Sequence, residues 1–176
     1  MKLTKNNFLK DPTKFLEREI LVVLVGLPGS GKTTWAKKTF GSGVYRERAI
    51  STDLYLETKA DQLNKTYTEV HARYLREAEK VMEAKFGGLV RKKKLIIWDQ
   101  TNLTKKKRKK ILNKIPNNYK TFVFVFDVDE DIVNERLEER AGETGKSIPV
   151  TVMNTMHRSF KQPTLEEGFD NVWINE

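Results

Sequence analysis

The sequence contains no cysteine and no long hydrophobic run. The lack of cysteine excludes a disulfide framework and a thiolate metal site, and it suits a reducing cytoplasm. The longest apolar run, Ile20 to Val25, is far shorter than the ~20 residues that span a bilayer. Residues 1–19 also lack the unbroken apolar stretch of a signal peptide. We therefore expect a soluble, cytoplasmic protein with no membrane partner.

Negative charge is scarce relative to positive charge. Lys and Arg number 33 against 24 Asp and Glu, which gives a net charge of +9. A basic chain attracts phosphate-rich partners, because binding releases their counterions. Basic proteins without nucleic-acid partners are also common, so charge alone leaves that question open. Hydrophobic residues make up 38% and charged residues 32% of the 176 residues, which indicates one globular domain.

Strand-like and helix-like segments alternate along the chain, without internal repeats or low-complexity linkers. Residues 1–19 are predicted to form a lead-in arm with a short helix after Pro12. Apolar runs predict strands at residues 20–25, 49–51, 95–98, 122–126 and 172–174. Capping residues and periodicity predict helices at residues 33–40, 64–86 (ended by Gly87-Gly88), 104–115, 129–140 (capped by Asp129 or Asp131) and 149–160. The Gly-rich residues 141–147 are predicted to form a mobile loop, which we expect to act as a lid. This alternation predicts an α/β fold of three layers, with a parallel sheet between two layers of helices.

A phosphate-binding motif follows the first predicted strand. Residues 26–33, GLPGSGKT, match G-x-x-x-x-G-K-[ST] at every fixed position, between a buried strand and a helix. Backbone N–H groups of Gly29, Ser30 and Gly31 form a nest for phosphate oxygens, and the helix amino terminus adds partial positive charge. Lys32 is predicted to bridge the β- and γ-phosphates. These features predict a P-loop domain over residues 20–176 that binds ATP.

The two threonines that follow complete the predicted nucleotide site. The Thr33 hydroxyl is a predicted ligand of Mg²⁺, and Thr34 is placed to reach the α-phosphate. A second Gly-Lys-Ser, at residues 145–147, has Arg140 where the motif requires glycine. We interpret that tripeptide as part of the mobile loop, not as another nucleotide site.

Acidic residues follow the second and third predicted strands. Phosphoryl transfer to an alcohol needs a carboxylate that accepts the hydroxyl proton, and Asp53 is predicted to be this base. Its alternative role is to cap the next helix, for which Ser51 and Thr52 also qualify. Asp99 is predicted to hold Mg²⁺ through water or to orient Thr33, the alternative being an ordinary turn.

Polar residues extend these strand ends. Thr101 and Asn102 belong to the same polar cluster as Asp99 and are predicted to contact the acceptor. Asp127 and Asp129 form a D-x-D at another strand end, as in phosphatases. Too few residues follow for a phosphatase domain, so we interpret these two acids as helix caps.

Basic residues near the predicted loop complete the site. Arg136 and Arg140 lie four apart on one helix face, from which an arginine can neutralise charge on the phosphates. Each can instead pair with neighbouring glutamates on a solvated face, an alternative that weighs equally for Arg136. The run Lys105 to Lys110 covers every side of its helix, so most of it is expected to be solvated. Part of this run is expected to lie near the ligand crevice at the carboxyl ends of the strands, where it could contact a phosphodiester backbone.

From Ile20 onward these features resemble the P-loop polynucleotide kinases, namely the bacteriophage 5′-polynucleotide kinase and the kinase domain of animal polynucleotide kinase 3′-phosphatase. The specific similarities are Asp53 at its spacing, the D-x-T-N pattern at residues 99–102, and segments 147–149 and 163–169. The resemblance implies an adenylate-kinase-like fold, ATP and Mg²⁺, and phosphorylation of a nucleic-acid 5′-hydroxyl. It further implies Lys32 and Thr33 at the nucleotide, Asp53 as general base and Arg140 as the lid arginine. Oligomers occur in the phage branch, so a homo-oligomer is one expectation.

One departure from the family concerns the acceptor. The phage pattern has an arginine three residues after the catalytic acid, where it contacts the acceptor's 3′-phosphate; this chain has Leu56. Either another basic residue replaces it, with Lys59, Arg46 and Lys106 as candidates, or the acceptor differs. The alternatives to a polynucleotide kinase are therefore a kinase for a small nucleoside, nucleotide or sugar, and a nucleotide-regulated nucleic-acid-binding module.

Overall fold

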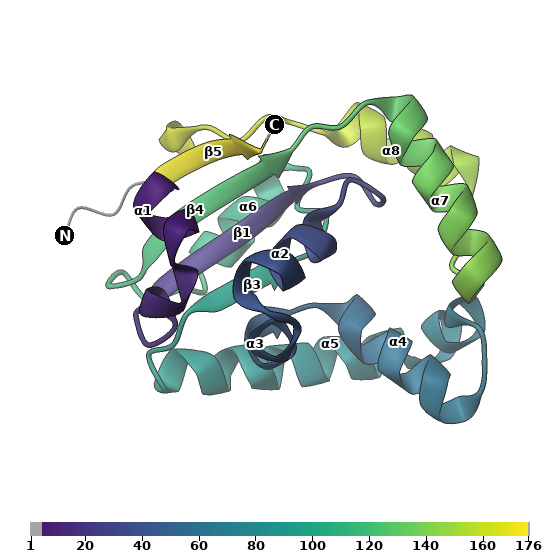
Figure 1. The fold of residues 1–176 in the computed structure, drawn as a ribbon, viewed down its shortest axis with the longest axis horizontal. Helices are drawn as coiled ribbons and strands as arrows, with labels where there is room; N and C mark the ends of the chain where they lie inside the picture. The colour runs from purple at the N-terminus through teal and green to yellow at the C-terminus, as the bar shows by residue number, and fades with distance from the viewer. Residues whose placement is uncertain (1–4, 176) are drawn as a thin grey trace.

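A five-stranded parallel sheet forms the centre of the computed structural model, which describes residues 5–175 (Figure 1). Its strand order is β2-β3-β1-β4-β5, and every neighbouring pair is parallel. The strands are β1 (Ile20–Gly26), β2 (Ala49–Ile50), β3 (Ile96–Asp99), β4 (Lys120–Phe126) and β5 (Asn171–Asn175). The predicted α/β fold with a parallel sheet is confirmed.

Eight α-helices and two 3₁₀ helices lie among the described residues and connect or flank the strands. They are α1 (Lys5–Lys10), η1 (Pro12–Phe15), α2 (Lys32–Phe40), α3 (Ser42–Arg48), α4 (Thr52–Leu63), α5 (Tyr67–Arg91), α6 (Lys105–Leu112), α7 (Glu130–Thr144), α8 (Val150–Ser159) and η2 (Leu165–Glu167). None of the helices within residues 5–175 is long and apolar enough to cross a membrane.

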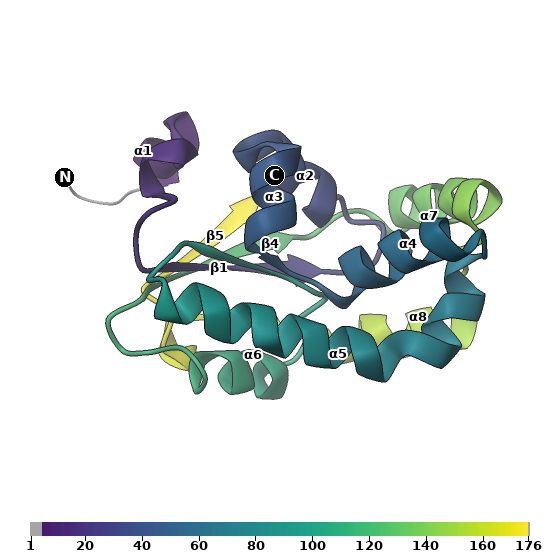
Figure 2. The same ribbon diagram turned by 90° about the horizontal axis from the view of Figure 1, so that it is seen from below.

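The sheet has a hydrophobic core on each face, because its apolar strands send alternate side chains to opposite sides. On one face, α5 and α6 pack Phe86 and Ile111 against Val23 and its neighbours. On the other face, α2 and α3 contribute Phe40 and Tyr45. Figure 2 shows α5 and α6 on one side of the strands and α1 to α3 on the other. These are the three predicted layers.

The described part of the predicted lead-in arm belongs to this core; residues 1–4 lie outside the described residues. Phe8 in α1 is fully buried and packs against Phe122 and Phe124 of β4, while Phe15 in η1 is nearly buried and packs against Phe8. The short helix predicted after Pro12 is the 3₁₀ helix η1.

The helix predicted over residues 64–86 is wrong at both ends. A first helix, α4, ends at Leu63, and α5 begins after Thr66, whose side chain forms a capping box with Glu69. At the other end α5 runs through Gly87 and Gly88 to Arg91. Leu89, which follows the glycines, lies in the core beneath the sheet, so its packing outweighs the low helix propensity of glycine.

The predicted loop over residues 141–147 is also wrong in part. Helix α7 begins after Asp129, whose carboxylate accepts a hydrogen bond from the Asp131 N–H, and it continues to Thr144. Gly145 ends it with φ of 68°, a left-handed conformation that suits glycine. The loop between α7 and α8 is therefore confined to residues 145–149. Helix α7, this loop and α8 together are called the lid segment below.

Candidate active site

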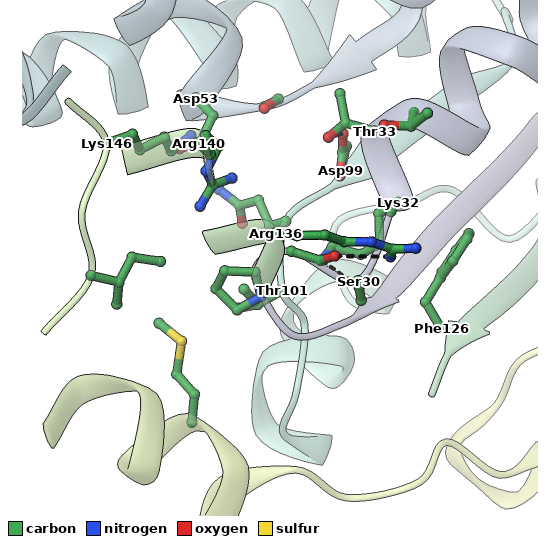
Figure 3. A pocket seen from close by; sticks show the side chains of 18 of the residues that line it. Ser30, Lys32, Thr33, Asp53, Asp99, Thr101, Phe126, Arg136, Arg140 and Lys146 are labelled. Carbon is green, nitrogen blue, oxygen red and sulfur yellow. Dashed lines mark hydrogen bonds and ion pairs between the residues drawn. The ribbon is translucent and has the colours of Figure 1, made fainter. Parts of the chain in front are cut away.

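A cleft of about 1600 Å³ opens where β1, β2, β3 and β4 end. The P-loop forms its floor, the starts of α4 and α5 form one wall, and the lid segment lines the rest of it and meets that wall at residues 145–146. Figure 3 shows Asp53, Arg140 and Lys146 together on one side, with Thr33 and Asp99 across the open space. This is the edge at which ligands bind in open parallel sheets.

The P-loop backbone has glycine where other residues do not fit. A Cβ at Gly26 would lie 2.7 Å from the carbonyl oxygen of Phe126, closer than real contacts allow. Gly29 and Gly31 have φ of 82° and 88°, which is left-handed backbone. The chain thus turns tightly from β1 into α2, with the helix amino terminus at the cleft. Ser30 and Thr34 of the predicted nucleotide site line the same cleft.

Lys32 is buried, and its Nζ donates to the carbonyl oxygens of Gly26 at 2.9 Å and Leu27 at 2.6 Å. It also bonds the Ser30 hydroxyl at 3.2 Å. Burial lowers the pKa of the Lys32 ammonium to about 8, against the attraction of Asp99 and Asp53. A cation held this way lies ready for phosphate oxygens at the P-loop.

The Asp99 carboxylate at the end of β3 is buried and accepts two hydrogen bonds at the same oxygen. The Thr33 hydroxyl donates at 2.6 Å and the Tyr45 hydroxyl at 2.7 Å. Burial and the Asp99 charge raise the pKa of the Tyr45 hydroxyl, which therefore stays a donor. The hydrogen bond to Thr33 fits the orienting role predicted for Asp99, and its predicted role toward Mg²⁺ stays a prediction.

These residues fit Mg²⁺ as P-loop proteins bind it. Among residues 5–175 no group of three His, Asp or Glu side chains is placed to hold a metal alone. Mg²⁺ prefers few protein ligands plus phosphates and water, which matches one hydroxyl and one nearby carboxylate. Because the Thr33 hydroxyl donates a hydrogen bond to Asp99, the lone pairs of its oxygen remain available to the metal.

The predicted acceptor residues after β3 separate into two roles. Thr101 lines the cleft, and its carbonyl oxygen accepts from the Gly26 N–H at 3.1 Å. Asn102 is only 1% exposed, with φ of 50°. Its side-chain amide donates to the carbonyl oxygens of Leu24 at 2.7 Å and Gln100 at 3.1 Å. The acceptor contact predicted for Asn102 is therefore corrected: its amide holds the strand ends together, since a buried amide must find backbone partners.

Asp53 lies in the first turn of α4 and does not cap the helix. Ser51 is the cap, with its hydroxyl accepting from the Leu54 N–H. The Asp53 carboxylate is half exposed toward the cleft and accepts from the Tyr67 hydroxyl at 2.7 Å and from Lys146 at 2.6 Å. Burial opposes ionisation of Asp53, but Lys146 and Tyr67 outweigh it and hold the pKa below its usual range. Asp53 is thus an ionised carboxylate facing the P-loop side of the cleft.

Both arginines of α7 reach the cleft. Arg136 donates to the Gly29 carbonyl oxygen of the P-loop at 3.2 Å, and no ion pair within the described residues joins it to the glutamates of its own helix. The Nε and Nη2 atoms of Arg140 are buried without a hydrogen-bond partner in the described part of the chain. Buried donors are normally satisfied, so these two atoms suit an anion such as a nucleotide phosphate.

Lys146 lies in the predicted mobile loop, and the sequence predicts no role for it. Its side chain is 7% exposed and bonds Asp53 and Glu57. No local pattern marks this lysine, because its partners lie 93 and 89 residues away. The predicted basic contacts to the acceptor differ too. Leu56 is buried between α4 and α5, and Lys59, Arg46 and Lys106 are not among the described side chains that line the cleft, whereas Lys38 and Lys107 are.

Solved structures with the same fold include kinases. One is a protein from Chloroflexus aurantiacus J-10-fl assigned as a kinase, with a TM-score of 0.62, 17% identity, and coverage of 91% of this chain and 85% of that one. Another is a gluconokinase from Sinorhizobium meliloti 1021, with a TM-score of 0.52, 17% identity, and coverage of 89% and 81%. At these identities the likeness shows the P-loop kinase-like fold.

Two matches identify relatives by sequence. Heterogeneous nuclear ribonucleoprotein U-like protein 2 is 28% identical in Mus musculus and 29% identical in Homo sapiens. Each match covers 94% of this chain, which spans about a quarter of those longer proteins, 23% and 22% respectively. The sequence profile of the AAA domain matches residues 21–163.

Proposed function

The chain belongs to the AAA domain family, a P-loop kinase-like family, and from that premise we propose that it transfers the γ-phosphate of ATP to the 5′-hydroxyl end of a DNA or RNA strand. The observation that carries the proposal is the ionised Asp53 carboxylate, which shares one cleft with Lys32 and Thr33. A nucleotide-binding switch needs the P-loop but no carboxylate at the acceptor side. A kinase needs both.

In the proposed reaction the acceptor oxygen attacks the γ-phosphorus while the bond from that phosphorus to the β,γ-bridging oxygen breaks. The hydroxyl proton passes to Asp53, and ADP leaves with the bridging oxygen. Lys32 and Arg140 neutralise the charge that develops on the phosphate oxygens. When bound through Thr33, Mg²⁺ supplies further neutralisation of the phosphates.

The acceptor class is supported by charge, by the size of the cleft and by the relatives. The chain carries a net charge of +9, and Lys38, His71 and Lys107 line the cleft besides the P-loop residues. A cleft of about 1600 Å³ exceeds the ~300–1,000 Å³ of a site for one drug-sized ligand, so it has room for ATP and an acceptor end. The relatives described above carry the name heterogeneous nuclear ribonucleoprotein U-like protein 2, which favours a nucleic-acid acceptor.

A small acceptor is the second candidate. The gluconokinase shares this fold, and Leu56 cannot contact a substrate because it is buried. A sugar or nucleoside kinase would use the same Asp53 and P-loop. The relatives' name also leaves a nucleic-acid-binding domain without transfer as a third outcome to test.

One experiment separates the three candidates. The protein is incubated with γ-labelled ATP and Mg²⁺ and with 5′-hydroxyl or 5′-phosphate oligonucleotides, nucleosides and sugars. We expect label only on the 5′-hydroxyl oligonucleotides. Label on a nucleoside or sugar alone would show that the acceptor is a small molecule and not a nucleic acid. Binding of oligonucleotide without labelled product would refute phosphoryl transfer.

The Asp53→Asn variant tests the base in the same assay. Asparagine cannot take the proton, so we expect turnover to fall by about 10²–10⁴-fold while ATP still binds. Asp61→Asn on the exposed part of the same helix is the matched control and should turn over normally. Near-normal turnover of Asp53→Asn would remove Asp53 from the reaction.

A further inference from the structure

Lys146 extends from the loop after α7 toward the start of α4. Its ammonium nitrogen lies 2.6 Å from Asp53 Oδ2, 3.0 Å from Glu57 Oε1 and 4.1 Å from the centre of the Tyr67 ring. Lysine is seldom buried without partners, and these three surround its charge. The lid segment thus meets the α4–α5 wall through one nearly buried cation.

The backbone beside Lys146 is fixed to the same wall. The Thr68 hydroxyl of α5 donates to the Gly145 carbonyl oxygen at 2.8 Å. A Cβ at Gly145 would lie 3.0 Å from Thr66 Cβ, so the loop backbone lies directly on the amino-terminal cap of α5. Lys146 therefore enters the cleft from a loop whose position depends on α5.

Asp53 is consequently bonded from two separate elements. Lys146 occupies Oδ2 from the lid segment, and Tyr67 occupies Oδ1 from α5. A carboxylate held at both oxygens cannot rotate about its terminal torsion, and one remaining lone pair can be directed at an acceptor hydroxyl.

We propose that Lys146 is a positioning residue for the phosphoryl transfer put forward above, fixing the Asp53 carboxylate while it docks residues 145–149 on the α4–α5 wall. The inference rests on the proposed function, because Asp53 is the base only if the protein is a kinase. It links lid docking to catalysis: the base is aligned only when the lid segment lies against α5.

The charge near Asp53 defines the expected pH effect. The groups that face it are Lys146 from the loop, Tyr67 from α5, Glu57 from α4, Arg140 from α7 and Lys32 from α2. In Lys146→Met the nearest cation is lost while burial and Glu57 remain. The Asp53 pKa should therefore rise, and the carboxyl should stay protonated to higher pH.

The first test needs no acceptor. The Asp53 carboxyl carbon is titrated by NMR in the wild type, Lys146→Met and Lys146→Arg. The control is Lys59→Met, since Lys59 also pairs with a glutamate and a tyrosine ring but lies outside the cleft. We expect the midpoint to rise by about one unit or more in Lys146→Met, and to stay near the wild-type value in Lys146→Arg and Lys59→Met. An unchanged midpoint in Lys146→Met would overturn the proposal.

The second test measures turnover with the acceptor identified in the labelling experiment. In Lys146→Met we expect kcat to fall at least about tenfold. The acidic side of the pH profile of kcat should move to higher pH, and the Kd for ATP should be nearly unchanged. Lys146→Arg should recover part of the loss. A moved midpoint with unchanged kcat would overturn the positioning role. Absence of product from the wild type with every acceptor would refute the proposed function, and the NMR result would still decide whether Lys146 controls Asp53.

Discussion

Lys32 lies folded against the P-loop, with its ammonium group bonded to two backbone carbonyl oxygens in a buried site. We expect nucleotide phosphates to change this environment. Without phosphates, burial lowers its pKa to about 8. Phosphate oxygens favour the charged form, so ATP binding raises that pKa again.

We expect ATP binding to take up a proton between about pH 8 and pH 10, because Lys32 is largely neutral in the free protein and charged in the complex. Affinity should fall as the pH rises through this range. Calorimetry near pH 9 in two buffers of different ionisation enthalpy measures the uptake. Lys32→Arg is the control, since arginine stays charged and removes the pH dependence. Zero uptake by the wild type would contradict the lowered pKa.

At the residue scale, the sequence predicts what depends on neighbours along the chain. The P-loop residues follow from a local motif, and Asp53 and Asp99 follow from their places after strands. Asn102 shows where such a prediction fails. It also follows a strand, but its side-chain amide donates to the Leu24 carbonyl oxygen and does not face the cleft. Lys146 could not be predicted at all, since its role depends on contacts with α4 and α5, which are distant in sequence.

At the scale of elements, α6 shows how a uniform charge pattern conceals different roles. Its lysines are exposed, but Arg108 within the same run is fully buried. The Arg108 guanidinium donates to both carboxylate oxygens of Glu167 in η2 at 2.7 Å. It also donates to the carbonyl oxygens of Asn102 and Leu103. Helix α6 is thereby joined to η2 and to the loop after β3, which shapes the cleft.

Arg108→Met should lower the free energy of unfolding by about 3–5 kcal/mol, because it leaves the buried Glu167 carboxylate unpaired. The exposed neighbour Lys109 is the matched control, and Lys109→Met should stay within about 0.5 kcal/mol of the wild type. Replacing Glu167 by Met as well should recover much of the loss, since no buried charge then remains. Urea denaturation measures all three. Equal stability of Arg108→Met and Lys109→Met would show that the pair contributes nothing.

Element boundaries were predicted less well than element types, for physical reasons. Helix propensity places a stop at Gly87-Gly88, but burial of Leu89 extends α5 by another turn. The glycine at position 142 likewise does not end α7, which continues to Thr144 and is capped by Gly145. In both helices tertiary packing or a later cap outweighs a local cost of about 1 kcal/mol for glycine.

At the scale of the whole molecule, the two ends of the described chain meet on one face of the sheet. Phe8 of α1 packs with its ring centre 6.1 Å from that of Trp173 in β5, and 5.8 Å from that of Phe122 in β4. Figure 1 shows α1 beside β4 and β5, on the side opposite the lid segment. Residues 1–19 are predicted as a lead-in arm that precedes the P-loop domain at residues 20–176. The described arm in fact covers aromatic side chains of the central strands.

Phe8→Ala should therefore destabilise the whole domain by about 3–5 kcal/mol, the usual cost of removing a fully buried phenylalanine. Urea denaturation followed by circular dichroism measures the loss, with Lys10→Ala on the exposed side of α1 as a control expected within about 0.5 kcal/mol. Because none of residues 5–19 lines the cleft, ATP affinity of the folded variant at low temperature should equal that of the wild type. A loss below about 1 kcal/mol would mean that the arm lies on a sheet already stable without it. If the free energy of unfolding falls by the expected amount and the ATP affinity is unchanged, the arm stabilises the sheet and the nucleotide site forms independently at the opposite end of the strands.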